Sequence, residues 1–595
     1  MSYTAPLKDM LFVMNELAGM STVNQLPGCE DATPDTVEAV LEENAKFCAA
    51  EIAPLNHPSD KEPSFWHGGE VTTAKGFKQA FQRFSEAGWQ GVQHPSEFGG
   101  QGLPKLLATP CIEMLNAASI SFALVALLSD GAIEALLTAG SDAQKALYLE
   151  PLISGKWTGT MNLTEPQAGS DLAAVRTRAV PQGDGSYKLF GTKIFITYGE
   201  HDMAENIVHL VLARTPDAPP GVKGISLFIV PKFLVGADGA LGARNDVHCV
   251  SLEHKLGIKA SPTAVLQFGD QGGALGTLVG EENRGLEYMF IMMNAARFGV
   301  GLQGIALAER AYQQAVTFAR DRVQSRDVAG SSGPVTIIHH PDVRRMLMSM
   351  RAQTEAARAL AYVGAGISDI AHHHPDAATR AARLAVYEYL VPVIKGWSTE
   401  MAQDVARDGV QVHGGMGFIE ETGAAQHYRD AKILTIYEGT TAIQANDLVG
   451  RKTVRDGGAV ARAILAEVNA VQAELAAAGP DLAAIGARLA AGSAALDAVI
   501  DYVVANAKAD VKGVFAGSVL YLKLAGIVLG GWQMGRAALA ARNKLDAGEG
   551  DAAFYKAKIA TARFFADHVL TQADGLRSAI VDGSAGVLAL DEAQF

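Results

Sequence analysis

The chain has 595 residues, of which 49% are apolar and 19% are charged, and its formal net charge is −14. This balance is typical of a globular protein with large buried cores, and the length predicts roughly three to five structural units. Nucleic-acid binding requires a concentrated excess of Lys and Arg, so the acidic composition argues against a nucleic-acid partner. It leaves room for a local basic pocket that binds a phosphorylated ligand.

The cysteines and the apolar stretches indicate a cytoplasmic protein. The four cysteines are far apart and form no CxxC pair, so neither a zinc site nor a disulfide framework is predicted. Residues 1–20 have an amphipathic pattern rather than the apolar core of a signal peptide, and the apolar stretch at 519–532 is too short to cross a bilayer. We therefore expect a reduced, cytoplasmic setting and no transmembrane segment.

Helical periodicity dominates the first part of the chain and gives way to β-rich runs near residue 158. The first two expected helices are 5–17 and 35–53. Further helices follow to about residue 152, interrupted by a glycine-rich loop at 94–103. The β-rich runs lie at 176–180, 187–197, 206–213, 225–230, 248–253 and 264–268. Asp184 and Gly185 predict a hairpin between the first two runs, in a compact β-domain.

Helical periodicity returns after Gly280 and continues to the end, where the chain becomes alanine-rich from about residue 453. The sequence therefore predicts a multidomain α+β protein. Its expected parts are an N-terminal helical extension at 1–40, a helical domain at 41–157, a middle β-domain at 158–279, a second helical domain at 280–452 and an additional helical domain at 453–595.

Glu438 is the candidate catalytic base, because apolar side chains between positions 433 and 437 precede it and Gly439 follows it. Shielding from water raises the pKa of a carboxyl group toward the pH at which a general base works. Gly439 lets the backbone approach a ligand, so its N–H can point at a carbonyl oxygen. The alternative is a surface Glu at a loop–helix junction, with Thr440 or Thr441 capping the next helix.

Two other patterns are discounted, and a third is informative. The GxGxxG match at 299–304 lies inside an expected helix with no strand before it, so we expect its glycines to permit close helix packing. The three histidines at 372–374 have no partner at ligand spacing, and we expect no metal. Residues 161–171 combine small hydroxyl donors, a glycine and exposed amides where helix gives way to strand, which suits a polar planar ligand and its phosphates. An ordinary capped turn explains the same pattern.

Together these segments resemble one family, the acyl-CoA dehydrogenases, which are FAD-dependent enzymes that introduce an α,β double bond into an acyl-CoA thioester. The resemblance runs from about residue 40 to 452, in the family's order of helical, β-barrel and helical domains. It rests on segments 95–102, 163–171, 193–197, 322–324, 411–417 and 437–440 and on Arg297. The start at 5–10 and the extra C-terminal helices are similar to the longer branch that includes 3-methylmercaptopropionyl-CoA dehydrogenase.

The resemblance implies a role for each matched residue. Glu438 corresponds to the base, and the Gly439 N–H and a flavin hydroxyl bind the thioester carbonyl. The implied cofactor-binding residues are Met161, Leu163, Thr164, Gly169, Ser170, Phe195, Thr197 and Thr440, with Arg322 and Gln324 at the pyrophosphate and Gln411 and Gly415 at the adenosine half, across a subunit boundary. The implied substrate-binding residues are Ser170, Asn294, Arg297 and Tyr437. A homodimer is expected, because the added C-terminal helices can occupy the surface through which tetrameric relatives pair.

Three positions carry a residue that differs from the one common in the family, and a fourth limits the choice of catalytic base. Some members keep their base just before the position of Arg297, where this chain has Ala296, so Glu438 is the one candidate. Phe195 stands where Trp is common beside the flavin, Ser325 where an aromatic is common near the pyrophosphate, and Ala442 where Gln is frequent. The contacts expected at Phe195, Ser325 and Ala442 are therefore left open. The prediction that Glu438 removes a proton does not depend on them.

The resemblance implies dehydrogenation of an acyl-CoA with an electron-transfer flavoprotein as the acceptor. An acyl-CoA oxidase, which uses oxygen directly, and 3-methylmercaptopropionyl-CoA dehydrogenation as the specific activity both stay open. A nitroalkane oxidase-like enzyme is expected to carry Asp in place of Glu438. DNA-binding relatives carry a basic C-terminal surface, whereas residues 453–595 mix Lys and Arg with many Asp and Glu. A non-enzymatic helical scaffold is expected to purify without colour.

Overall fold

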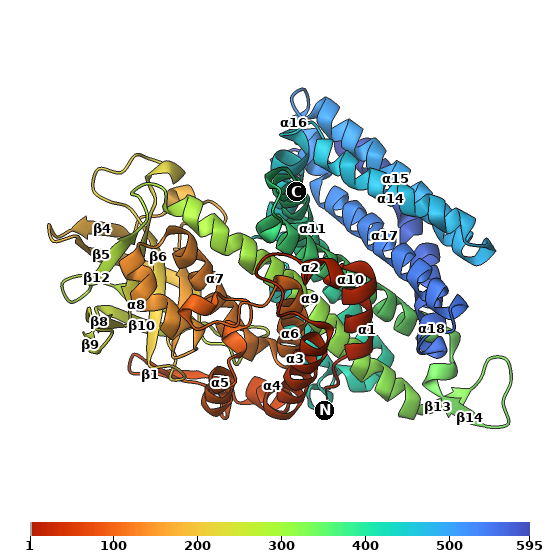
Figure 1. Ribbon diagram of the computed structural model, residues 1–595, viewed down its shortest axis with the longest axis horizontal. Helices are drawn as coiled ribbons and strands as arrows, with labels where there is room; N and C mark the ends of the chain where they lie inside the picture. The colour runs from red at the N-terminus through yellow and green to blue at the C-terminus, as the bar shows by residue number, and fades with distance from the viewer. Residues whose placement is uncertain (1–2) are drawn as a thin grey trace.

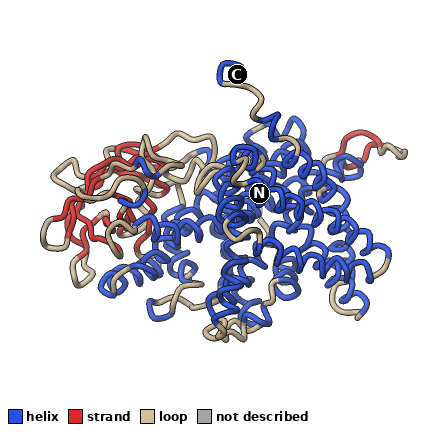
Figure 2. The backbone as a smooth tube through the Cα atoms, turned by 90° about the horizontal axis from the view of Figure 1, so that it is seen from above, coloured by secondary structure: helices blue, strands red, loops and turns tan. Residues whose placement is uncertain are grey.

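The computed structural model describes residues 3–595, and helices account for most of the chain. A curled sheet forms one end of the molecule, two helical layers form its middle, and the C-terminal helices cover the far side (Figure 1). Seen at right angles, the strands are again confined to one end, apart from a small hairpin at the opposite end (Figure 2). The predicted multidomain α+β fold, with an added C-terminal helical part, is confirmed.

The N-terminal part is helical, as expected, with one small exception. Its helices are α1 (Leu7–Phe12), α2 (Met20–Val23), α3 (Pro34–Phe47), α4 (Ala53–Lys61), α5 (Phe77–Glu86), α6 (Lys105–Ala118), α7 (Ile120–Ala139) and α8 (Asp142–Ile153). Helix α3 begins where the Thr33 side chain accepts a hydrogen bond from the Thr36 N–H, and a π-helical turn joins it to α4. The hairpin β1 (Phe65–His67) and β2 (Glu70–Thr72) was not predicted.

The middle part is an eight-stranded sheet in the order β10-β11-β5-β12-β7-β6-β3, with β4 paired to β5. The six expected runs correspond to β4 (Arg178–Pro181), β5 (Ser186–Thr197), β6 (Asn206–Ala213), β7 (Ser226–Pro231), β10 (Val247–Leu252) and β11 (Thr263–Phe268), and the predicted hairpin joins β4 to β5. The strands missed are β3 (Trp157–Asn162), β8 (Phe233–Val235), β9 (Leu241–Arg244) and β12 (Ala274–Val279). Strand β3 is buried along its whole length and therefore shows no alternation.

The second helical part consists of α9 (Gly285–Asp321), α10 (Pro341–His373), α11 (Ala377–His413), α12 (Ala424–Leu434) and α13 (Thr441–Val449). The hairpin β13 (Val323–Arg326) and β14 (Pro334–Thr336) follows α9. The glycines of the discounted GxGxxG match lie inside α9, as expected. A Cβ on Gly301 would be 2.6 Å from Ile394 of α11, and one on Gly304 would be 2.6 Å from the Ser398 carbonyl oxygen. These glycines therefore permit close packing of α9 on α11.

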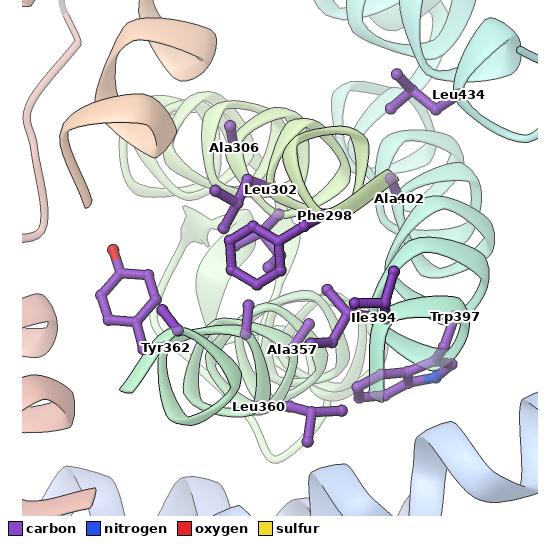
Figure 3. Close-up of a cluster of buried hydrophobic side chains, with 14 of the residues drawn as sticks. Phe298, Leu302, Ala306, Ala357, Leu360, Tyr362, Ile394, Trp397, Ala402 and Leu434 are labelled. Carbon is purple, nitrogen blue, oxygen red and sulfur yellow. The ribbon is translucent and has the colours of Figure 1, made fainter. Parts of the chain in front are cut away.

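A buried cluster fills the space between α9, α10 and α11 (Figure 3). Phe298 and Leu302 of α9 lie between Ala357 of α10 and Ile394 of α11, and Leu434 of α12 lies at its edge. Burial of such side chains stabilises the folded chain by about 1.5 to 3 kcal/mol each. The cluster fixes the relative positions of the helices that frame the candidate site.

The C-terminal part packs on α10, α11 and α13. Its helices are α14 (Ala459–Ala477), α15 (Pro480–Asn506), α16 (Val511–Ala516), α17 (Ser518–Asp546), α18 (Ala552–His568), α19 (Ala573–Val581) and α20 (Ser584–Val587). Trp397 of α11 lies over Gly526 and Gly530 of α17, where a Cβ would come within 2.2 and 2.5 Å of the indole. The last residues project beyond the helices (Figure 2).

A buried network of charges joins the N-terminal segment to the C-terminal part. Arg358 of α10 forms ion pairs with Asp9 at 2.8 Å, Glu113 at 2.6 Å and Glu309 at 2.8 Å. Lys558 of α18 pairs with Asp9 and, at 2.8 Å, with Glu355 of α10. Segments distant in sequence are therefore held in one network, and removal of one charge leaves its partners uncompensated.

Three helices are long and apolar enough, by length and composition, to cross a membrane. They are Ile120–Ala139, Gly285–Asp321 and Pro480–Asn506, and 78%, 72% and 50% of their most apolar windows are buried inside the protein.

Two of the expected domain boundaries fall within helical segments. Residue 40 lies within α3 and residue 452 within the π-helical turn Gly450–Val454, so the chain crosses both limits without a linker.

Candidate active site

Glu438 and Gly439 form the turn between α12 and α13, and both have left-handed backbone conformations, with φ of 52° and 88°. Such a φ is ordinary for glycine and strained for Glu. A Cβ on Gly439 would lie 2.6 Å from Gln444 Nε2 and 3.2 Å from Ile443, so Gln444 would have to move to admit a side chain there. The turn therefore presents the Glu438 side chain in a conformation that the surrounding structure must enforce.

Side chains from two helices hold the turn. Lys395 Nζ of α11 donates to the carbonyl oxygens of Leu434 at 2.8 Å and Gly439 at 2.6 Å. Gln444 Nε2 donates to the carbonyl oxygens of Glu438 at 3.3 Å and Gly439 at 3.2 Å. The Gly439 N–H itself has no acceptor within residues 3–595.

The Thr440 hydroxyl has a structural role that the alternative interpretation predicted. It accepts a hydrogen bond from the Ile443 N–H at 3.3 Å and so caps α13. Thr440 was also predicted to bind the cofactor, and no observation tests that role.

The Glu438 carboxylate has no hydrogen-bond or ion-pair partner in the described part of the chain, although part of the side chain reaches the surface. Burial raises the pKa of Glu438 above its ordinary value, and the charges of Arg297 and Lys395 oppose this shift. A carboxylate with a raised pKa and unused lone pairs is suited to accept a proton from a ligand.

The predicted wall around Glu438 is only partly correct. Tyr437 lies against α9, where its hydroxyl donates to Gln303 Oε1, and Leu434 is fully buried. Ile436 is 49% exposed and therefore lies outside the wall. Sequence reasoning missed Gln303, because nothing in the local pattern of α9 distinguishes it.

Arg297 lies beneath the turn rather than open to solvent. It is 3% exposed, its Nη1 is 3.5 Å from Asp447 Oδ2 of α13, and its Nε has no partner. Asn294, one turn earlier, is exposed, and its Oδ1 is 3.5 Å from Arg297 Nη1. The structure thus places Arg297 with Glu438 and Gly439, whereas its predicted contact with substrate is untested.

The expected flavin-contacting residues gather where β3 and β5 end. Phe195 is 57% exposed and has φ of 59°, at an irregularity in the pairing of β5 with β11, and Thr197 is the last residue of β5. Leu163 and Thr164 follow β3, and the Thr164 carbonyl accepts a hydrogen bond from the Ile194 N–H at 2.9 Å. The prediction that helix gives way to strand at 161–171 is wrong, because residues 161 and 162 end strand β3 and the rest of the segment is a loop.

Further residues of this group differ in exposure. Gly169 and Ser170 are exposed, and a Cβ on Gly169 would meet nothing within 4 Å. Met161 is buried, and its sulfur and the Met292 methyl of α9 lie 3.9 and 3.4 Å from the Cβ position of Gly131 in α7. The Met161 side chain therefore packs between the β-domain and the helices.

A buried ion pair that sequence reasoning missed holds this group together. Lys193 Nζ of β5 lies 2.9 Å from Glu165 Oε1 and donates to the Leu163 carbonyl oxygen at 3.0 Å. Glu165 also accepts from the N–H groups of Arg176 at 2.8 Å and Thr177 at 3.0 Å. Although burial opposes it, the Lys193 charge and these hydrogen bonds lower the pKa of Glu165 to about 2. The pair fastens the loop after β3 to β5.

Contacts with α12 bring the end of β5 toward the Glu438 turn. The Tyr198 N–H, just after β5, donates to the Pro262 carbonyl oxygen at 2.8 Å. The loop that contains Pro262 donates, through the Ile258 N–H, to Asp430 Oδ1 of α12 at 2.5 Å. Leu434, the last residue of α12, then leads into the turn.

The remaining expected cofactor residues lie at the opposite end of α9. Arg322 ends this helix, and Arg322, Gln324, Gln411 and Gly415 are all exposed. The helix ends are adjacent, because the rings of Phe318 and His413 are 4.4 Å apart. The Arg322 guanidinium has no partner within residues 3–595. At 1.5 Å per residue, Arg322 lies about 37 Å along α9 from Arg297.

The donors at these two places fit a flavin dinucleotide. An exposed aromatic ring beside Thr164 and Thr197 suits a flat ring system, and an unpaired guanidinium beside amide side chains suits a pyrophosphate. The two sets lie at different ends of α9, along which about 37 Å separates Arg297 from Arg322.

Family models match most of the chain. The N-terminal domain model of the acyl-CoA dehydrogenases matches residues 34–156, the middle domain model 160–271 and the C-terminal domain model 283–452. A model described as acetyl-CoA dehydrogenase C-terminal like matches residues 464–591. The matches follow the order of the parts seen in the structure.

Individual proteins are similar over almost the full length. The 3-methylmercaptopropionyl-CoA dehydrogenase of Ruegeria pomeroyi is 54% identical over 99% of this chain and 99% of its own. The broad-specificity linear acyl-CoA dehydrogenase FadE5 of Mycobacterium tuberculosis is 36% identical over 100% of both chains. Butyryl-CoA dehydrogenase of Megasphaera elsdenii shares 26% identity with a TM-score of 0.57, over 70% of this chain and 98% of that one. An acyl-CoA dehydrogenase of Bacillus anthracis in complex with FAD has the same fold, with a TM-score of 0.73, 22% identity and coverage of 98% and 93%.

Proposed function

Because the chain belongs to the acyl-CoA dehydrogenase family and is an oxidoreductase of acyl-CoA thioesters, we propose that Glu438 removes the α-proton of the bound acyl-CoA. The observation that carries this proposal is the carboxylate at the end of α12, which is unpaired, has a raised pKa and lies in a strained turn. Strained backbone persists where the surrounding structure enforces it, which is common at catalytic residues.

The turn also supplies a donor for the thioester. A proton next to a thioester carbonyl is too weakly acidic for a carboxylate to remove unless the developing enolate oxygen is stabilised. The Gly439 N–H, which has no acceptor within residues 3–595, donates to that oxygen. Gln444 Nε2 donates to the carbonyl oxygens of Glu438 and Gly439, so the donor and the base keep a fixed relative orientation.

The second hydrogen leaves as a hydride, and a flavin supplies the acceptor when bound. We propose FAD, with its ring system against Phe195, Thr197 and Thr164. Arg322 and Gln324 of a second subunit then contact the pyrophosphate, and Gln411 and Gly415 of that subunit contact the adenosine half. The distance along α9 between Arg297 and Arg322 supports a homodimer with each cofactor shared between subunits.

The partners and setting follow from the relatives. We propose an electron-transfer flavoprotein as the acceptor, because a caffeyl-CoA reductase-Etf complex subunit of Acetobacterium woodii is 30% identical over 62% of this chain. We propose a cytoplasmic setting and a role in fatty-acid β-oxidation. We assign the three apolar helices, whose most apolar windows are 50% to 78% buried, to the interior of the protein. The identity of 54% to the Ruegeria pomeroyi protein makes 3-methylmercaptopropionyl-CoA the first substrate to test.

The test is anaerobic reduction of the bound flavin, followed by its absorbance, with 3-methylmercaptopropionyl-CoA and straight-chain acyl-CoAs. We expect Glu438→Gln to keep its fold and flavin and to lose a factor of at least about 100 to 10,000 in the reduction rate, because an amide does not accept the proton. Glu421→Gln, at an exposed position, is the matched control. A Glu438→Gln protein that bleaches at the wild-type rate would show that another group is the base. Air is then admitted to the reduced protein. Because an oxidase uses oxygen directly, the response of the flavin absorbance distinguishes an oxidase from a dehydrogenase.

A further inference from the structure

Lys395 is a buried ionisable group at the candidate site that the proposed reaction does not yet use. It lies on α11, directly after Ile394 of the buried cluster, and it is 0% exposed. No carboxylate lies within ion-pair distance of its Nζ in the part of the chain that the structure describes. An ammonium group held in an apolar interior without a directly bonded counter-charge is unfavourable, so its position requires another explanation.

The contacts of Nζ join the two sides of the Glu438 turn. Nζ donates to the carbonyl oxygen of Leu434, which ends α12, at 2.8 Å, and to that of Gly439, which follows the base, at 2.6 Å. These two carbonyl groups belong to residues on either side of Glu438, whose backbone is in the strained left-handed region. One side chain on a helix fixed by the core thus prevents the turn from opening.

We propose that Lys395 is a positioning residue for the base, which it holds through both carbonyl groups and keeps ionised through its charge. This inference rests on the proposed role of Glu438. It assigns to the lysine no contact with substrate or with the reacting atoms.

The charges around the turn are consistent with this role. Burial lowers the pKa of Lys395 to about 8, and the nearby Glu438 opposes the shift. In return, the Lys395 charge lowers the pKa of Glu438, in the same sense as Arg297 of α9. Arg297 is itself paired with Asp447, which also binds Arg451 at 2.7 Å.

Glu400, the remaining carboxylate near the turn, raises the pKa of Lys395 through its charge but forms no ion pair with it. It lies on α11 and accepts a hydrogen bond from the Thr441 hydroxyl at 2.5 Å. Lys395 is therefore a cation whose field acts on Glu438 without a direct ion pair to weaken it.

The experiment compares Lys395→Met and Lys395→Gln with the wild-type holoenzyme in anaerobic flavin reduction across the active pH range. In Lys395→Met we expect a rate about 100-fold lower, as for a displaced catalytic group. We also expect the acid limb of the pH profile to move to higher pH, because the neighbouring cation is gone. Lys395→Gln keeps N–H donors without the charge, so part of the rate returns while the acid limb stays displaced.

Lys558→Met is the control, because Lys558 is a buried lysine in the charge network of α18. It lowers thermal stability and leaves the acid limb unchanged. A wild-type acid limb in either Lys395 variant overturns the inference. A Lys395→Gln protein whose only defect is lower stability, as in Lys558→Met, overturns it as well. Should Lys395→Met fail to fold, Lys395→Gln decides alone.

The outcome with Glu438→Gln separates this inference from the proposed function. If Glu438→Gln is inactive and the Lys395 variants keep the wild-type profile, the lysine has no positioning role while the base stands. If Glu438→Gln is fully active, the proposed base is wrong whatever the lysine does.

Discussion

The pKa values of two glutamates in this chain are shifted in opposite directions by their surroundings. Glu438 is unpaired, and burial raises its pKa, with the opposing charges of Arg297 and Lys395 outside direct contact. Glu165 is bonded to Lys193, Arg176 and Thr177, and despite burial its pKa falls to about 2. Partners therefore decide whether a buried carboxylate is held as a structural anion or left available for a proton.

Glu165→Gln is expected to destabilise the protein, because it leaves the buried Lys193 without a counter-charge. Removal of one partner from such a pair costs about 3 to 5 kcal/mol, and we also expect flavin to be lost more easily, since the pair fastens the loop of Thr164. Urea unfolding and flavin retention at neutral pH measure both effects. Glu42→Gln, on the exposed face of α3, should change neither.

The stabilisation from Glu165 has a predictable pH dependence. The folded-state pKa of about 2 lies below the ordinary value of 4.5, so the carboxylate binds a proton less readily when folded. Its contribution is present in full above pH 4.5 and is lost as the pH falls through about 2. The stability difference between wild type and Glu165→Gln should therefore shrink below pH 4.5. A difference that stays constant in acid would mean that the pair is not the cause.

At the residue scale, the sequence predicted the groups that stand out locally and missed those that act through the fold. Glu438 was a candidate because apolar residues precede it and a glycine follows it, and its role as the base stays a prediction. Lys193 and Lys395 lie in an ordinary strand and an ordinary helix, and their partners are 28 and 39 or more residues away. Their burial and contacts depend on tertiary packing, which no local pattern encodes.

At the element scale, the close contact of α9 and α11 positions the site, because Arg297 and Lys395 come from these two helices. Their separation is set by Gly301 and Gly304, where the α11 backbone and Ile394 leave no room for a Cβ. Close packing of this kind tolerates little added volume.

Gly304→Ala should therefore destabilise the protein by about 1 to 3 kcal/mol and slow flavin reduction, since the new methyl group would lie 2.6 Å from the Ser398 carbonyl oxygen. Thermal unfolding and the anaerobic bleaching rate measure the two effects. Gly575→Ala in α19 is the matched control, because a Cβ there meets nothing within 4 Å. It should be neutral or slightly stabilising, as is usual for Gly to Ala within a helix. Equal effects of the two substitutions would refute the packing argument.

The helices with strong periodicity were predicted well, whereas the short strands β8 and β9 and the buried strand β3 were missed. The amphipathic helices carry their period in the chain, and β6 was predicted as a β-rich run although all its residues are buried. Strands β8 and β9 have three and four residues and pair only with each other, so they show no usable period. The turn of Glu438 was placed correctly, whereas its left-handed backbone depends on the side chains that hold it.

At the scale of the whole molecule, the expected cofactor residues form two groups at the two ends of α9. Thr164, Ser170 and Thr197 belong to the β-domain, whereas Arg322 directly precedes the hairpin β13–β14 at the opposite end of the molecule (Figure 1). Gln411 lies near the end of α11, which is adjacent to the end of α9. The family resemblance predicted that these residues form two separate groups. The length of α9 agrees with that separation. Exposed apolar side chains at the second end, Met416, Phe418 and Ile419, agree with an interface there.

Arg322→Ala tests the shared cofactor site, because Arg322 is an unpaired, exposed cation with no structural partner within residues 3–595. Loss of one charge-assisted hydrogen bond to a pyrophosphate costs about 1.5 to 3 kcal/mol, which weakens FAD binding about tenfold or more. We expect the variant to purify with less than one flavin per subunit. FAD binds only the assembled dimer in this proposal, so added FAD should restore thermal stability in a way that depends on protein concentration. Arg326→Ala, on the same hairpin, is the matched control and should keep its flavin. A wild-type protein that sediments as a flavin-loaded monomer at micromolar concentration would exclude a site completed by a second subunit.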